Sequence, residues 1–173
     1  MKPTKLAKTM SWFAVLLWMI VIFTFSAQNA TDSSRLSQKT TKKVAELSIK
    51  EFKKLPKDSQ FKIIDKLEVK TREFAHLLLY TVLGMLAMAA LSGYKSKAGI
   101  FIAFAMCALY AATDEVHQIF VQERGAELSD FFIDSCGAVI GITFTLLLKR
   151  IIKFLMLKLQ KIQFRNRPQI DPN

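Results

Sequence analysis

The chain has 173 residues, 51% of them hydrophobic, and its 25 lysines and arginines against 14 acidic residues give a net charge of +11. Six glycines and four prolines exclude a collagen-like or low-complexity chain, and the hydrophobic fraction excludes intrinsic disorder. The charged residues are concentrated outside long apolar runs, so these runs decide the fold class.

Four apolar runs predict four membrane-spanning helices. A helix needs roughly 20 apolar residues to cross a bilayer, and the runs lack the polar stripes of a soluble bundle. The third run, 98–113, is short, so we expect its helix to continue through Asp114 or Lys97 to snorkel. The sequence predicts one all-α domain over 1–173, an integral membrane four-helix bundle, with spans at about 10–28, 74–94, 98–120 and 130–148.

The first run has an alternative interpretation as a signal peptide. Lys2, Lys5 and Lys8 precede it, as in the basic region of a signal peptide, and the small residue Ser26 ends it. No A-x-A cleavage pattern follows, and the run is long for the apolar part of a signal peptide. We therefore interpret it as the first span.

Residues 29–73 are expected to form an extracytoplasmic loop with helical segments. An amphipathic helix is predicted in 34–55, with an apolar face made of Val44, Leu47, Phe52 and Leu55. Pro56 breaks this helix, and Ser59 is expected to cap a second helix that runs into the second span. The lysines of this loop are either merely solvated or attracted to anionic lipid or wall polymers.

A polar stripe runs along the second span. Arg72, His76, Tyr80 and Gly84 recur every four residues, which places them on one side of a helix. Polar residues beside lipid are costly, so this side is expected to face other helices.

The third span ends in the sequence Asp114-Glu115-Val116-His117-Gln118. Asp114, His117 and Gln118 are three and four residues apart and so share a helix face. The connection that follows contains Arg124.

The fourth span repeats the pattern of polar and small residues on one face. Ser129 is expected to cap this helix, with Asp130 in its first turn. Asp134, Gly137 and Gly141 follow on the same face as Asp130. Glycines at this spacing, like Gly84 in the second span, let the backbone of another helix approach closely in lipid.

Lysine and arginine counts favour a location of both termini in the cytoplasm. This orientation puts 12 of these residues inside and 13 outside, but 12 of the outer 13 lie in the long loop, where translocation overrides the positive-inside rule. The basic tail, 149–173, is then expected to continue the fourth helix and lie on the cytoplasmic leaflet.

In this orientation the polar residues of three spans meet at the outer ends of the helices. We expect one inward-facing cluster of Arg72, His76, Tyr80, Asp114, Glu115, His117, Gln118, Arg124, Asp130 and Asp134. The alternative is an ion-pair and hydrogen-bond network that only holds the helices together. The region is acidic: residues 114–130 carry a net charge of −4, and Asp134 adds −1.

Several of these residues also carry a family resemblance. Three further groups of residues belong to the same pattern: Phe25-Ser26-Ala27-Gln28 with Ser33 and Ser34, Glu73-Phe74-Ala75-His76, and Phe120 after the Asp-Glu-x-His-Gln block. Over about residues 10–148 the chain resembles the VanZ-like family, which usually has Pro-Gly before the arginine where this chain has Gln122-Glu123. The resemblance implies a multi-pass protein of the bacterial cytoplasmic membrane. The family takes its name from a protein that accompanies glycopeptide-resistance genes and gives modest protection against teicoplanin.

Three functions are compatible with this pattern. The first is a non-enzymatic cell-envelope protein that binds an anionic lipid or lipid-linked wall precursor, with Arg72 and Arg124 holding the phosphate. The second is a membrane hydrolase or transferase acting on lipid phosphates, with a histidine as base or with a metal. The metal would be held by His76, His117 and one carboxylate, with Glu115 as first choice and Asp114, Asp130 and Asp134 as alternatives. The third is a small transporter or assembly partner that works as a homo-oligomer.

The partners expected from the sequence are membrane lipids, with no nucleic acid. No cofactor is expected under the first function, whereas a divalent cation belongs to the metal-dependent form of the second.

Overall fold

The computed structural model describes residues 4–28, 41–91, 96–121 and 127–165. These residues form long helices and two short helical segments, and within these ranges there is no strand. The elements are α1 (Lys5–Ser26), a short helix at 41–48, the 3-10 helix η1 (Phe52–Lys54), α3 (Lys57–Ala90), α4 (Ser96–Gln118) and α5 (Leu128–Arg165). The predicted all-α fold is confirmed.

The four long helices, α1, α3, α4 and α5, are each long and apolar enough to cross a membrane. Their outward surfaces carry large apolar side chains, and only 11% of the most apolar window of α1 is buried inside the protein. Such surfaces suit a lipid environment, so the chain is a multi-pass membrane protein. The third helix continues through Asp114 to Gln118, which gives the short apolar run its spanning length.

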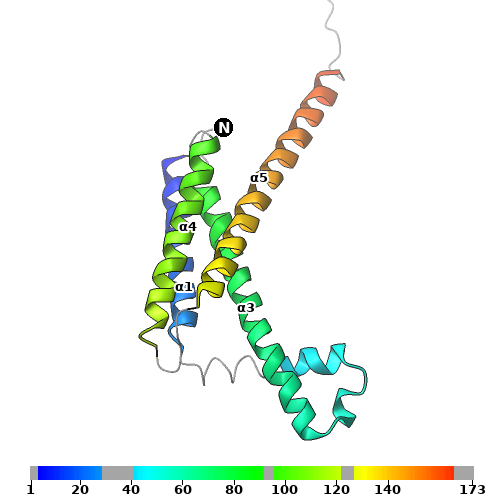
Figure 1. The fold of residues 1–173 in the computed structure, drawn as a ribbon. Helices are drawn as coiled ribbons and strands as arrows, with labels where there is room; N and C mark the ends of the chain where they lie inside the picture. Colours follow the sequence, from blue (N-terminus) through cyan, green and yellow to red (C-terminus); the bar gives the residue numbers. More distant parts are fainter. Residues whose placement is uncertain (1–3, 29–40, 92–95, 122–126, 166–173) are drawn as a thin grey trace, which may run out of the picture.

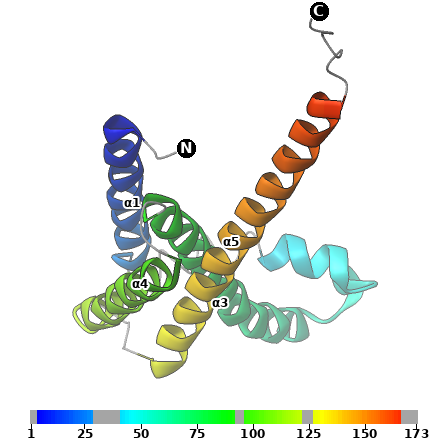
Figure 2. The same ribbon diagram turned by 90° about the horizontal axis from the view of Figure 1, so that it is seen from above.

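Helix α3 is the centre of the bundle and contacts each of the other three long helices (Figures 1 and 2). Its most extensive contact is with α5, which crosses it at an angle (Figure 2). The core between the helices contains mainly small and aliphatic side chains, together with Tyr80. The start of α1 and the end of α5 lie toward the same end of the bundle (Figure 1).

Glycines make the crossing of α3 and α5 close. A methyl group added at Gly84 would overlap the carbonyl oxygen of Ala138, and one added at Gly141 would overlap that of Thr81. Gly137 faces the backbone of Leu77 in the same way. All three glycines singled out from the sequence therefore lie where the two backbones meet.

Gly141→Val is expected to lower the unfolding free energy of the protein in detergent by about 3 kcal/mol, at the upper end of the usual cost of overpacking. The reason is that the atom in the way belongs to the backbone of α3, which cannot rotate aside. Thermal unfolding of the purified protein measures the effect. Ala89→Val, at an exposed position of α3, is the control and should change little; equal effects of the two substitutions would contradict the close approach.

The segment before α3 differs from its prediction. The helix at 41–48 ends early, because Glu51 adopts a left-handed conformation (φ 67°) that turns the chain into η1. Phe52 is consequently buried while Leu47 is 88% exposed, so the single apolar face predicted for this segment is wrong. Residues 29–40, which include the start of the predicted helix, lie outside the described residues.

Two predicted helix caps lie inside their helices, because the helices begin two or three residues earlier than predicted. Helix α3 begins at Lys57, directly after Pro56, so Ser59 lies inside its first turn. Helix α5 begins at Leu128, so Ser129 is also inside the helix, with Asp130 in the first turn. As predicted, the helix that begins after Pro56 runs without interruption into the second span.

The C-terminal half of α5 extends away from the bundle (Figure 1). The side chains of residues 150–162 are all exposed, and they alternate between large apolar groups and lysine or arginine. The helix thus continues past the bundle into the basic tail, and its placement on a lipid leaflet remains a prediction.

Candidate functional site

Polar side chains from all four long helices meet at one end of the bundle. Ser26 is the last residue of α1, Asp114 and Gln118 lie in the last turns of α4, and Asp134 lies near the start of α5. His76, from the middle of α3, completes the group. All five residues are at least nine-tenths buried, and Ser26 and Asp134 are 0% exposed. We call them the buried cluster.

Asp114 accepts hydrogen bonds from two other members of this cluster. The hydroxyl of Ser26 donates to Asp114 Oδ2 over 2.7 Å, and the amide of Gln118 donates to the same oxygen over 3.4 Å. His76 Nδ1 lies 3.6 Å from Asp134 Oδ1, close enough for an ion pair but without a hydrogen bond. Ligand atoms of His76, Asp114 and Asp134 all lie within 4.8 Å of one another.

Several buried polar atoms around this point have no hydrogen-bond partner among the described residues. They include both carboxyl oxygens of Asp134, the Nδ1 atom of His76 and the hydroxyl of Tyr80, which is 0% exposed. A buried polar group without a partner costs about 1–3 kcal/mol, and an unpaired charge costs more. A network selected only to hold helices together would be expected to satisfy these atoms.

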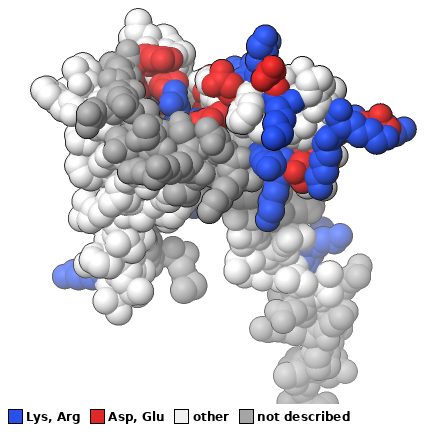
Figure 3. Space-filling model, turned by 90° about the horizontal axis from the view of Figure 1, so that it is seen from below, with Lys and Arg blue, Asp and Glu red and all other residues white. Residues whose placement is uncertain are grey.

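The described part of the site is rich in negative charge. Asp130 lies within electrostatic reach of Arg72 and His76, and the hydroxyl of Tyr80 lies within reach of the carboxyl groups of Asp114 and Asp134. Figure 3 views this end of the molecule and shows acidic side chains over the bundle, beside a surface crowded with lysine and arginine. The basic surface belongs to the unit that projects from the bundle, made of residues 41–55 and the start of α3 (Figures 1 and 3).

A cleft lies between α4 and the start of α5. It has a volume of about 320 Å³ and is lined by Ala112, Glu115, Glu127, Leu128 and Phe131. One oxygen of Glu115 accepts a hydrogen bond from the backbone N–H of Glu127 over 2.9 Å, while the other oxygen is buried and has no partner in the described part of the chain. The cleft is therefore apolar along most of its wall and has carboxyl groups at one side.

His117 is not part of the group of ligand atoms around His76. Its ring packs against Phe23 with 4.5 Å between the centroids, and its Nε2 atom is buried without a partner among the described residues. The set of metal ligands drawn from the sequence, His76, His117 and Glu115, is thus not the set that the structure brings together, because Asp114 and Asp134 take the positions next to His76. Arg124 lies outside the described residues.

Ser26 was not among the site residues chosen from the sequence. Its position at the end of an apolar run suggested only a helix terminus, yet its hydroxyl is buried against Asp114. The signal was its place in the Phe25-Ser26-Ala27-Gln28 segment, one of those that carry the family resemblance.

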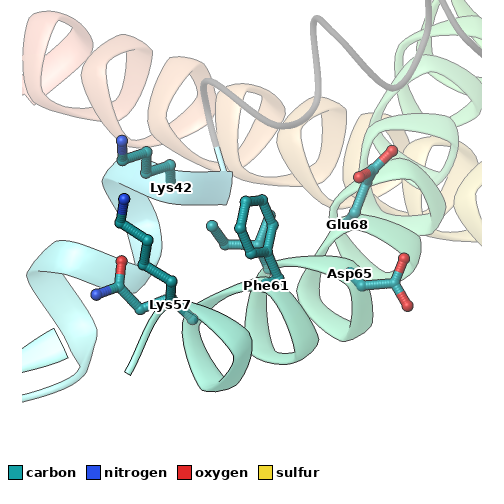
Figure 4. A pocket seen from close by; sticks show the side chains of 7 residues that line it. Lys42, Lys57, Phe61, Asp65 and Glu68 are labelled. Carbon is teal, nitrogen blue, oxygen red and sulfur yellow. The ribbon is translucent and has the colours of Figure 1, made fainter. Parts of the chain in front are cut away.

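A second groove lies outside the bundle, on the projecting unit. It has a volume of about 470 Å³ and is lined by Lys42, Lys57, Gln60, Phe61, Ile64, Asp65 and Glu68. Figure 4 shows the lysines near one end of the groove, Phe61 in the middle and the acidic pair toward the other end. No residue singled out as a site residue lines it.

The region that forms the bundle matches a known protein family. A model of the VanZ/LLP1 family matches residues 11–149, which span all four helices of the bundle and the whole buried cluster. The chain belongs to the VanZ-like family. The match ends where α5 leaves the bundle, so the exposed C-terminal half of that helix lies outside the VanZ-like region. No curated protein and no solved structure matches the chain.

Proposed function

We propose that this VanZ-like protein acts in the bacterial cell envelope, where it binds the phosphate-bearing headgroup of an anionic lipid or lipid-linked wall precursor at the buried cluster. By holding this ligand it contributes to resistance against glycopeptides such as teicoplanin. Both termini are in the cytoplasm in this proposal, so the cluster faces the outer surface of the cytoplasmic membrane.

One observation carries the proposal: all four helices deliver polar side chains to the same end of the bundle, and several of the buried atoms there lack partners. Unpartnered groups at the depth of a membrane surface suit a ligand with a polar headgroup and an apolar chain. The cleft beside Glu115 supports this, because its walls of Ala112, Leu128 and Phe131 suit an apolar chain.

The charge of the site restricts how a phosphate can bind. The described cluster and its surroundings hold the carboxyl groups of Asp114, Glu115, Asp130 and Asp134, and Arg72 lies within electrostatic reach of Asp130. A phosphate placed directly among these groups would be repelled. The phosphate can be held where positive charge offsets these carboxylates, either from Arg72 at the edge of the site or from a bound cation.

Asp134→Asn is expected to abolish protection against teicoplanin. The substitution keeps the shape of the side chain but removes a charge from the centre of the cluster. The measurement is the teicoplanin concentration that inhibits a susceptible Gram-positive host expressing the wild type or the variant at equal membrane abundance.

Asp65→Asn is the matched control, since it makes the same chemical change on the exposed surface of α3, far along the helix from the cluster. It should protect as the wild type does. The proposal is contradicted by a wild type that gives no protection, or by an Asp134→Asn variant that is equally abundant and equally protective.

A second candidate function, a metal-dependent hydrolase or transferase acting on lipid phosphates, is favoured by one observation. The ligand atoms of His76, Asp114 and Asp134 form a group of three, and catalytic metal sites use three protein ligands and leave a position open for water. Release of inorganic phosphate from a polyprenyl phosphate would favour the enzyme, whereas binding without turnover favours the proposal above.

A further inference from the structure

The three central side chains of the buried cluster have the arrangement of a cation site. His76 comes from α3, Asp114 from α4 and Asp134 from α5, and their ligand atoms lie within 4.8 Å of one another. Ligands that share one metal ion at about 2.0–2.2 Å lie at most about twice that distance apart. A small inward movement of the side chains would thus complete the coordination.

Several buried polar atoms at the centre of the cluster lack a hydrogen-bond partner among the described residues. Asp134 is 0% exposed, yet neither carboxyl oxygen has a hydrogen-bond partner among the described residues, and the Nδ1 atom of His76 also lacks one. Independently, the fully buried hydroxyl of Tyr80 has no partner and lies within electrostatic reach of both aspartates. These atoms are either lone-pair acceptors or a hydroxyl, which are groups that surround bound cations and their water ligands.

The charge of the site also favours a bound cation. The carboxyl group of Asp134 lies within electrostatic reach of Asp114 and Asp130, and Glu115 lies within reach of all three. Among the described residues, the cations nearby are His76, when protonated, and Arg72, which lies within reach of Asp130. In a buried environment this excess of negative charge destabilises the fold unless a cation or protons offset it.

The surrounding residues already orient one ligand. Ser26 and Gln118 both donate hydrogen bonds to Oδ2 of Asp114, from two different helices. Outer hydrogen bonds of this kind fix the direction of a metal-binding carboxylate and commonly change metal affinity 10–100-fold.

We propose that His76, Asp114 and Asp134 bind one divalent transition-metal cation, with Zn²⁺ or Mn²⁺ as the best match. One imidazole and two carboxylates form a mixed nitrogen and oxygen donor set, which suits these ions better than the all-oxygen set preferred by Ca²⁺ and Mg²⁺. Three protein ligands leave coordination positions open, and an open position accepts a phosphate oxygen. The inference rests on the proposed function for the identity of that phosphate ligand, but the cation site itself does not.

The test is zinc binding by the purified full-length protein in detergent. The protein is treated with a chelator, equilibrated with ZnCl₂ by dialysis, and its metal content is measured by mass spectrometry. The wild type and the control Asp65→Asn are expected to bind about one Zn²⁺ per chain. His76→Gln and Asp134→Asn should each lose at least tenfold in affinity for Zn²⁺. Ser26→Ala should weaken binding less than either of these two substitutions does, within the range known for outer hydrogen bonds.

Ser26→Ala keeps the test decisive if a ligand variant fails to fold, because it removes no ligand atom. His117→Gln checks the ligand set: its metal content should equal that of the wild type. The inference is overturned if the folded wild type binds neither Zn²⁺ nor Mn²⁺, or if the folded Asp134→Asn variant binds as the wild type does. Protection against teicoplanin without bound metal would overturn the cation site alone, whereas bound metal without protection would overturn the proposed function alone.

Discussion

Asp134→Asn is expected to stabilise the cation-free protein and to destabilise the zinc-loaded protein relative to the wild type. Without a cation, the carboxylates of Asp114 and Asp134 repel each other, and at their separation of less than 4.8 Å this repulsion is about 3 kcal/mol for an effective dielectric constant near 20. The asparagine removes it. With a cation bound at 100 times its dissociation constant, the wild type gains about 2.7 kcal/mol that the variant cannot gain.

The measurement is thermal unfolding of both proteins in detergent, with a chelator and with ZnCl₂. The two curves should change order between the conditions, and Asp65→Asn should follow the wild type in both. A variant that is less stable than the wild type under both conditions would instead identify Asp134 as part of a hydrogen-bond network without a cation. A change of order is more informative than a loss of stability, because general damage to the fold lowers both curves.

Much of the fold follows directly from the sequence, because the four apolar runs predict the long helices and Pro56 marks the start of α3. The early end of the helix at 41–48 could not be predicted. It depends on the left-handed backbone of Glu51 and on the burial of Phe52, and both are set by tertiary packing rather than by local spacing.

The residues of the site were easier to predict than their pairing. A spacing of four places His76 and Tyr80 on one face of α3, and the structure buries both. Which carboxylate meets His76 depends on how far α4 and α5 are rotated about their axes, and Gly137 and Gly141 fix that rotation for α5 through backbone contact with α3. The sequence favoured His117 and Glu115 as partners of His76, whereas the structure groups His76 with Asp114 of α4 and Asp134 of α5.

The second large effect concerns the ligand. Zinc-loaded protein is expected to bind a polyprenyl monophosphate at least tenfold more tightly than the chelated protein, because the cation reverses the charge that a phosphate meets at Asp114 and Asp134. The same difference should be absent for the polyprenyl alcohol, which lacks the phosphate. Weak binding of inorganic phosphate, compared with tight binding of the polyprenyl phosphate, would assign the remaining affinity to the apolar cleft beside Glu115.

The most direct test of the central claim is the affinity of the full-length protein, in lipid nanodiscs, for a polyprenyl monophosphate with and without Zn²⁺. We predict that binding of the polyprenyl monophosphate requires the cation. Asp134→Asn should lose this binding, and Asp65→Asn should keep it. Binding that is equally tight after chelation and in Asp134→Asn would contradict this prediction.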